Sequence, residues 1–359
     1  MPDTKADQAL GEGARILTIC NACRYCEGYC AVFPALERRL SFSAADLNYL
    51  ANLCHHCGEC YYACPYAPPH QFAVNVPKTL SEIRVASYRQ YAWPAPVGAW
   101  LAPVAFLIGL AIWIVVERAR GGPGLPADFN GLIRHGTMAG VFGAISLFVL
   151  VAFLAGLVQL WRESGQRFAR LLDLSALRRA ASDVFTLKYL EGQGRGCTYP
   201  DESHSRTRWW FHQLTFYGFL SCFASTTVAA IYHYVFGWKA PYAYLSAPVV
   251  LGTLGGIGLL VGPVGLLWLK QRQDEATRAG QQNRLDIAFI ALLFLTSATG
   301  LALLAFRATA AMPALLAVHL AIVLALFVTL PYGKFVHSIY RAAALLRYAL
   351  EQSREEGTV

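Results

Sequence analysis

Hydrophobic residues gather into six long runs along the chain, whereas the segment before the first run mixes apolar and polar positions. Each run is close in length to the roughly 20 residues that an α-helix needs to cross the hydrocarbon core of a bilayer. The runs cover Val97–Val116, Met138–Leu160, Trp209–Phe236, Ala247–Leu269, Leu285–Phe306 and Met312–Tyr332. One such run could be a buried core helix, but six in sequence favour membrane spans. The pattern predicts an α-helical integral membrane protein with a six-span helix bundle.

The segment before the first run forms a separate small domain in this prediction, covering residues 1–92. The sequence changes abruptly at Trp93-Pro94-Ala95-Pro96, and aromatic residues of this kind are enriched at membrane interfaces. We therefore predict a membrane domain over residues 93–340 and a cytoplasmic tail over residues 341–359.

The composition agrees with a membrane protein and excludes several other classes. Hydrophobic residues make up 56% of the 359 residues and charged residues only 14%, whereas soluble globular proteins carry about 25% charged residues. An ordinary soluble enzyme, a disordered chain and a nucleic-acid-binding protein are therefore excluded, despite a formal net charge of +8. In a membrane protein, basic residues are expected mainly at the cytoplasmic ends of the spans.

The distribution of these basic residues predicts the orientation. No long apolar run precedes Cys20, so we expect the first domain to stay in the cytoplasm. After six spans the C-terminus returns to the same side. The predicted inside segments contain Arg162, Arg167, Arg170, Arg178, Arg179, Lys188, Arg195, Arg206, Arg208, Lys270, Arg272, Arg278, Arg284, Lys334, Arg341 and Arg347. The outside segments contain only Arg118, Arg120, Arg134, Lys239 and Arg307. This bias places both termini in the cytoplasm.

Eight of the ten cysteines lie between Cys20 and Cys64, which is too local for a disulfide framework and indicates metal binding. They form two motifs: Cys20, Cys23, Cys26 and Cys30, then Cys54, Cys57, Cys60 and Cys64 before Pro65. Two-cluster bacterial ferredoxins share this spacing, and there the fourth cysteine of each motif binds the cluster of the other. We therefore predict two [4Fe–4S] clusters in a ferredoxin-like domain. One is assigned to Cys20, Cys23, Cys26 and Cys64, and the other to Cys54, Cys57, Cys60 and Cys30.

Zinc is the competing interpretation, because cysteine pairs at this spacing also suit a tetrahedral site of four thiolates. A zinc ribbon needs two pairs, however, and not two complete quartets with a trailing proline. The first motif departs slightly from the pattern, since Pro34 follows Cys30 at a distance. His55 and His56 could tune a cluster through hydrogen bonds to sulfur, although histidines in such loops are more often solvent-exposed.

Four histidines near the ends of predicted spans are candidate haem ligands. His212 and His233 lie in the third span, while His319 and His337 lie in and just past the sixth. The two separations correspond to helical rises of about 31 Å and about 27 Å, respectively. His319 and His337 also return to one helical face at about 100° per residue. The matching depths predict two axial pairs for one or two b-type haems, His212 with His337 inside and His233 with His319 outside.

Histidines at span ends are often interfacial residues, which is the alternative for all four. His135 and His204 lie in predicted loops and are reserve candidates. The glycine-dense segment LGTLGGIGLL lies inside a predicted span, so it is no dinucleotide-binding fingerprint. We expect the chain to bind neither flavin nor nicotinamide and to leave the substrate chemistry to another protein.

Four segments are similar to the tricarballylate/citrate-utilization protein B family: CNACRYCEGYCAVFPALERR, LCHHCGECYYACPYAPPHQFAVNVP, TLKYLEGQGRGCTYP and FHQLTFYGFLSCFASTTVAAIYHY. The similarity covers nearly the whole chain. It implies an iron–sulfur protein of the bacterial cytoplasmic membrane that takes electrons from an FAD-dependent, tricarballylate dehydrogenase-like partner and passes them to membrane quinone. The segment HLAIVLALFVTLPYGKFVH is also similar to the haem-binding subunit of respiratory nitrate reductase, in which two histidines at this separation lie on one helix.

The expected function is that of an electron-transfer component of a quinone-linked oxidoreductase, with quinone as the substrate. A membrane redox sensor or assembly factor is the alternative, and it would hold clusters without needing a haem. A redox-driven transporter would need carboxylates in mid-span. Asp286, at the start of the fifth predicted span, is the nearest candidate and lies too close to the interface.

Overall fold

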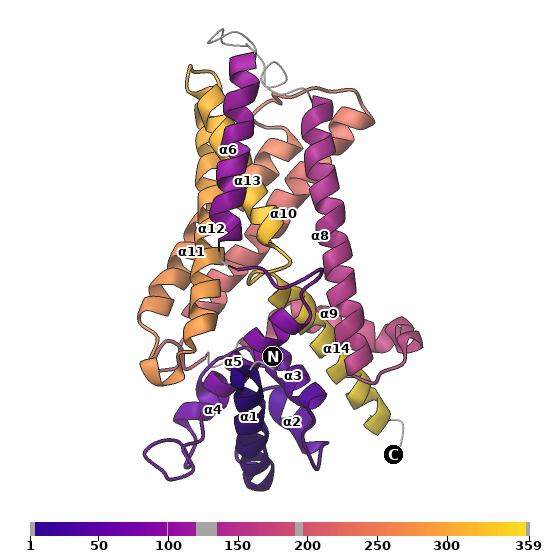
Figure 1. Ribbon diagram of the computed structural model, residues 1–359, viewed down its shortest axis with the longest axis vertical. Helices are drawn as coiled ribbons and strands as arrows, with labels where there is room; N and C mark the ends of the chain where they lie inside the picture. Colours follow the sequence, from indigo (N-terminus) through magenta and orange to yellow (C-terminus); the bar gives the residue numbers. More distant parts are fainter. Residues whose placement is uncertain (1–3, 99, 120–134, 191–196, 357–359) are drawn as a thin grey trace.

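The structure is a computed structural model that describes residues 4–98, 100–119, 135–190 and 197–356. Arg120, Arg134 and Arg195 of the predicted loops lie outside the described residues. Within them, all regular secondary structure is helical, and the strand-like pairing is one isolated bridge between Cys197 and Ser205. Figure 1 shows a head of short helices at one end and long helices running away from it.

The head consists of five helices packed around an apolar core. They are α1 (Thr4–Cys23), α2 (Val32–Glu37), α3 (Ala44–Leu53), α4 (Glu59–Tyr62) and α5 (Val76–Gln90). Leu17, Leu50 and Ile83 are almost completely buried where α1, α3 and α5 meet. Ser43 begins α3 with a capping box, in which its hydroxyl accepts a hydrogen bond from the Asp46 backbone. The apolar faces of these helices therefore support the cysteine loops that follow α1 and α3.

The long helices form the second part of the molecule. They are α6 (Leu101–Ala119), α8 (His135–Glu163), α10 (Thr207–Tyr234), α11 (Ala247–Gln271), α12 (Gly280–Ala305) and α13 (Met312–Thr329). Five of them, all except α6, are long and apolar enough to cross a membrane. In α6, the described side chains form a shorter apolar helix over residues 101–112. These helices indicate a multi-pass membrane protein.

Glycines let two of the long helices approach each other closely. A Cβ atom at Gly258 on α11 would lie 2.9 Å from the Leu214 carbonyl oxygen on α10, and one at Gly218 would lie 3.0 Å from the Gly255 carbonyl oxygen. Small residues allow such backbone contact in membranes, where packing rather than water exclusion drives association. This contact fixes the position of α10, which carries His212.

The sixth apolar run is not one continuous helix. It ends as α13 at Thr329, and a new helix, α14 (Val336–Glu356), begins six residues after Leu330. Pro331 lies in the break, where it lacks a backbone N–H to continue the helical ladder. The prediction that His319 and His337 share one helical face is therefore wrong, because the turn angle cannot be counted through the interruption.

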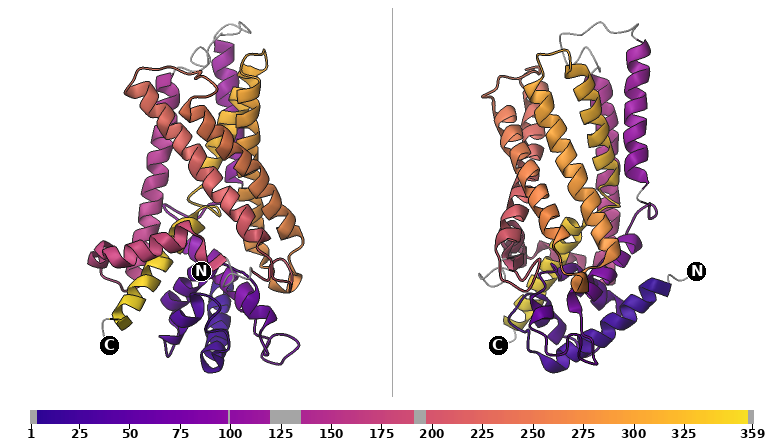
Figure 2. Two further views of the ribbon diagram at one scale, coloured as in Figure 1. Left: turned by 180° about the vertical axis from the view of Figure 1, so that it is seen from behind. Right: turned by 90° about the vertical axis from the view of Figure 1, so that its left-hand side faces the viewer.

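Residues 341–356 of the predicted tail belong to α14, which packs against the head. The Arg39 side chain pairs with Glu351 on α14 at 2.6 Å, and Arg347 pairs with Asp46 on α3 at 3.3 Å. The connection between α8 and α10 contains η1 (Phe168–Leu172), α9 (Leu174–Phe185) and η2 (Lys188–Leu190), and η3 (Glu275–Thr277) precedes α12. Figure 2 shows that α1 and α14 both lie at the head end of the molecule.

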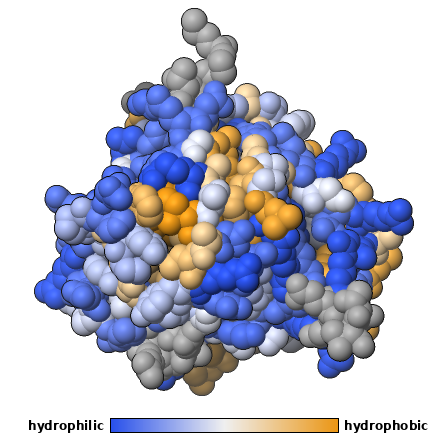
Figure 3. All heavy atoms as spheres, turned by 90° about the horizontal axis from the view of Figure 1, so that it is seen from below, coloured by the Kyte–Doolittle hydropathy of each residue, from blue (hydrophilic) through white to orange (hydrophobic). Residues whose placement is uncertain are grey.

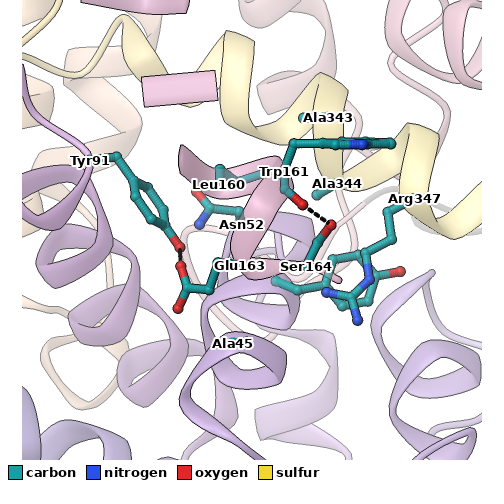
Figure 4. A pocket seen from close by; sticks show the side chains of 11 residues that line it. Ala45, Asn52, Tyr91, Leu160, Trp161, Glu163, Ser164, Ala343, Ala344 and Arg347 are labelled. Atoms are coloured by element: carbon teal, nitrogen blue, oxygen red, sulfur yellow. Dashed lines mark hydrogen bonds between the residues drawn. The ribbon is translucent and has the colours of Figure 1, made fainter. Parts of the chain in front are cut away.

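A small cavity marks the joint between the head and the long helices (Figure 4). Its lining includes Asn52 of α3, Trp161 and Glu163 of α8, and Arg347 of α14. The Tyr91 hydroxyl donates a hydrogen bond to Glu163 across it. The cavity has room for about one water molecule, so we interpret it as part of a structural joint and not as a ligand site.

Candidate functional site

The structure brings the eight clustered cysteines together in two groups. One cavity in the head is lined by Cys20, Cys23, Cys26 and Cys64, which we call the first cysteine site. A second is lined by Cys30, Cys54, Cys57 and Cys60, the second cysteine site. The last cysteine of each motif thus lies with the first three of the other motif. Cys60 also lines the first cavity, so the two sites are direct neighbours.

Local backbone geometry shapes the second site. Helix α3 ends at Cys54, whose backbone is extended, and the chain then turns through left-handed conformations at His56 and Gly58. A Cβ atom at Gly58 would lie 2.7 Å from the Thr198 carbonyl oxygen, so only glycine fits both the turn and the neighbouring segment. Because of this turn, Cys54, Cys57 and Cys60 line one cavity.

Burial favours the protonated thiol at both sites, as Cys20 and Cys30 show. Burial, followed by the neighbouring thiols of the same site, raises the pKa of Cys20 to about 12. Burial and the nearby Cys54 likewise raise the pKa of Cys30 to about 12. Metal binding releases such protons, because the thiolate is the ligand form. The donor set therefore fits a positively charged iron–sulfur core.

The arrangement fits a cluster better than a single ion. Within the described residues, no three His, Cys, Asp or Glu side chains converge closely enough to hold one metal ion. A tetrahedral zinc site needs such convergence, since its thiolates lie about 2.3 Å from the metal. Thiolates around a four-iron core lie further apart, because irons and sulfides fill the centre.

The two cysteine sites differ in their access to solvent. Cys23 of the first site is exposed, and the neighbouring Tyr25 side chain is 62% exposed. In contrast, Cys54 and Cys57 of the second site are buried. Figure 3, which views the head from below, shows a largely hydrophilic surface around a small apolar area. The first site is therefore the more accessible of the two to solvent.

His56 is buried and His55 is partly buried, so the expectation that they are solvent-exposed is wrong. The Ser81 hydroxyl lies 2.9 Å from Nδ1 of His56, and the Thr277 carbonyl oxygen lies 3.0 Å from its Nε2. A neutral ring satisfies both by accepting at Nδ1 and donating at Nε2. Burial, then nearby arginines, lowers the pKa of His56 well below its usual range. This histidine fastens the loop of the second site to the segment before α12.

Three arginines bind the backbone of the second site. Arg208 donates to the carbonyl oxygens of His56 at 2.6 Å and His55 at 2.9 Å. Arg341 donates to the Leu53 carbonyl oxygen at 3.1 Å. Arg84 donates to the carbonyl oxygens of Ala51 and Cys54, at 2.7 Å and 2.5 Å.

Sequence reasoning missed this arginine triad of Arg84, Arg208 and Arg341. Its members come from three distant parts of the chain, on α5, α10 and α14. A usable signal exists, because Arg208 precedes His212 by four residues and Arg341 follows His337 by four. Residues four apart lie on the same side of a helix.

His212 and His337 lie side by side at the head end of the long helices. Their ring centroids are 6.4 Å apart, with ring planes at 79°. Nδ1 of His337 lies 2.9 Å from the Lys334 carbonyl oxygen, so a donated proton there leaves Nε2 free as a metal ligand. Nδ1 of His212 is buried and has no hydrogen-bond partner in the described part of the chain. The two rings are near enough that both imidazoles would be able to hold one metal ion of a cofactor between them.

The other predicted residues lie elsewhere. Nδ1 of His319 is 3.0 Å from the Thr299 hydroxyl on α12. The ring centroids of His233 and Tyr234 are 5.0 Å apart. Pairing of His233 with His319 stays a prediction. His204 is largely exposed in the loop before α10. The Asp286 carboxylate forms ion pairs with the ammonium groups of Lys270 at 2.6 Å and Lys334 at 2.9 Å. These pairs indicate a structural role for Asp286.

Cys197 lies against the second site without belonging to its cavity lining. It is fully buried and packs in one apolar group with Cys57. Its thiol donates to the Leu190 carbonyl oxygen at 3.1 Å. The packing of Cys197 against Cys57 joins the α8–α10 connection to the head.

Comparison with known proteins gives consistent matches over the whole chain. The family described as citrate utilization protein B matches residues 94–358, and its Fer4-like domain matches residues 13–90. A protein of Escherichia coli named citrate utilization protein B is 47% identical over 354 residues, covering 96% of this chain and 93% of the relative. No solved structure matches the chain.

Proposed function

The chain belongs to the citrate utilization protein B family, and from this premise we propose that it is an electron-transfer protein of the bacterial cytoplasmic membrane. It takes electrons from an FAD-dependent dehydrogenase of the tricarballylate or citrate type. It passes them through two [4Fe–4S] clusters and b-type haem to membrane quinone. The Fer4-like domain with its eight cysteines supports the iron–sulfur part of this proposal.

The cysteines would hold the clusters in the crossed arrangement described above. The first cysteine site would bind one cluster and the second the other. Bound clusters supply one-electron carriers, whose potentials depend on charge, hydrogen bonding and solvent exposure. Cys23 and its exposed surroundings would receive the reduced partner, while the buried second site would face the membrane domain.

One observation carries the proposal: the second site is hydrogen-bonded to the two helices that bear the close histidine pair. Arg208 and His212 lie one turn apart on α10, and Arg341 and His337 lie one turn apart on α14. Both arginines donate to backbone oxygens of the second site. Electron transfer between two cofactors needs a short, rigid separation, and these helices would provide it.

The close histidine pair near the second cysteine site argues against the sensor or assembly-factor alternative. A sensor needs no histidine pair beside its clusters, whereas His212 and His337 approach each other to 6.4 Å between ring centroids. The haem at this pair would be the acceptor for the second cluster. His233 and His319 would serve a second haem or contact quinone.

The proposed orientation keeps the head and both termini in the cytoplasm, with α6 as the sixth span. Gly109 on α6 supports this, because a Cβ atom there would lie 3.0 Å from the Ala321 backbone on α13. A reporter that is active only outside the cytoplasm should be silent after Val359 and active at Lys239. The opposite pattern would overturn this orientation.

The function is tested with purified full-length protein in detergent under anaerobic conditions. Dithionite should bleach the iron–sulfur absorption and produce the alpha band of a b-type cytochrome. Adding menadione as the quinone should then reoxidise both. Clusters that are reduced but stay reduced after menadione, without an alpha band, would favour the sensor instead.

A further inference from the structure

The two cysteine sites differ in the number of arginines that bind their backbones. The second site is bound by the arginine triad, whose guanidinium groups donate to the backbone between Ala51 and His56. In the described part of the chain, no carboxylate forms an ion pair with any of the three. The triad is thus a concentration of positive charge that the polypeptide leaves uncompensated.

The three charges are close enough to act on one another and on the thiols. Burial, together with Arg84 and Arg208, lowers the pKa of Arg341 to about 10, which leaves it charged at neutral pH. Cys54 and Cys30 act on the pKa of Arg341 in the opposite direction and raise it. Arg341 therefore interacts electrostatically with two members of the second site, although its hydrogen bond goes to Leu53.

Among the described residues, the first site is bound by one arginine, Arg24, which donates to the Asn21 carbonyl oxygen at 3.2 Å and is exposed to solvent. A carboxylate, Glu59, directly precedes Cys60, which lines both cavities. Glu59 also lies 3.8 Å from His204, an exposed residue that carries charge only when protonated. The surroundings of the first site are therefore less positive than those of the second.

Charge of this kind changes a reduction potential in a known direction. Four thiolates outweigh the positive core, so a bound cluster is an anion that gains one more negative charge on reduction. Nearby positive charge stabilises the reduced form and raises the potential, whereas burial alone disfavours that form and lowers the potential. Burial alone would lower the potential of a cluster at the second site and make it the poorer electron acceptor. The positive charge of the arginine triad raises this potential.

We propose that the arginine triad raises the potential of the cluster at the second site above that of the first, and so directs electrons from the exposed end of the head toward His212 and His337. This inference rests on the proposed function. It adds that the direction of electron flow is set by three residues that bind the backbone of the second site. Arg84, Arg208 and Arg341 are positioning and charge-setting residues in this account.

The test is an anaerobic redox titration of the full-length protein, followed by EPR. Cys23→Ser identifies the signal of the first site by its loss. In the wild-type protein, the second site should be reduced at the higher potential. Arg341→Gln keeps a donor for Leu53 but removes the charge. It should lower the reduction equilibrium constant of the second site about tenfold, which is about 59 mV for one electron.

Three comparisons make the result decisive. Arg341→Lys, which keeps the charge, should leave the potential of the second site close to that of the wild-type protein. Arg208→Gln should lower this potential as Arg341→Gln does. Arg167→Gln removes an exposed charge on the α8–α9 connection and should change neither site. If Arg341→Lys and Arg341→Gln shift the potential of the second site equally, the inference is overturned. It is also overturned if the second site of the wild-type protein is reduced at a lower potential than the first. Absence of clusters from wild-type protein would instead contradict the proposed function.

Discussion

The ring of His212 on α10 lies 6.4 Å, centroid to centroid, from the ring of His337 on α14. The two residues are 125 positions apart in the sequence, and each lies one turn from an arginine that binds the second cysteine site. If this pair holds a haem, His212→Ala should leave a five-coordinate iron or none. The alpha band of the reduced protein should be lost or shifted, and quinone reduction should fall at least about tenfold.

The matched control for that variant is His204→Ala. His204 is largely exposed and lies in the loop before α10, so its loss should change neither the spectrum nor the rate. Both variants should keep both clusters reducible. An unchanged alpha band in His212→Ala would rule out this residue as an axial ligand.

The crossed cysteine arrangement predicts that neighbouring positions serve different clusters. Cys64→Ser should damage the cluster of the first site, because Cys64 lines the first cavity with Cys20, Cys23 and Cys26. Cys60→Ser should damage that of the second, because Cys60 belongs to the motif of Cys54 and Cys57 and lines the second cavity with them. Iron content should fall from about eight to about four per protein in each variant. EPR should then show different residual signals, and identical spectra would contradict the crossing.

The close contact between α10 and α11 predicts a cost for a single methyl group. Gly258→Ala places a Cβ atom 2.9 Å from the Leu214 carbonyl oxygen, which α10 can relieve only by moving. We expect a loss of about 1–3 kcal/mol in stability, measured by thermal unfolding in detergent. Gly140→Ala on α8 meets nothing within 4 Å and should be neutral or slightly stabilising, since alanine favours helices. Equal melting temperatures for the two variants would show that the contact is not tight.

Burial of His56 predicts a pH dependence of stability. Its pKa is lowered in the folded protein, while the unfolded chain takes up a proton below about pH 6.5. The stabilisation is therefore complete above that pH and is lost as the pH falls toward the folded pKa, by up to about 1.4 kcal/mol per pH unit. Thermal unfolding between pH 7 and pH 5 should show a shallower decline in His56→Gln than in the wild-type protein. Parallel declines would mean that His56 already carries a proton when folded.

Local patterns in the sequence were sufficient for the parts of this protein whose physics is local. The cysteine spacing predicted which thiols would share a cavity, because three cysteines at these intervals wrap one loop around a common centre while the fourth points toward the other motif. The long apolar runs predicted membrane helices, because a bilayer requires about 20 apolar residues whatever their neighbours. Depth counted from the same runs also led to His212 and His337, which the structure brings together.

Features that depend on contacts between distant segments could not be read in this way. Pro331 interrupts the last run, so His337 reaches His212 through a new helix and not through the single helical face that periodicity suggested. His56 was misjudged because its burial comes from Ser81 and Thr277, residues far along the chain. The four-residue spacing of Arg208 and Arg341 from His212 and His337 places each pair on one side of a helix but does not reveal which backbone the arginines bind. Hydropathy and residue spacing depend on the local sequence of one helix or loop. The roles of His56, Arg208 and Arg341 depend instead on which surfaces pack together once the chain has folded.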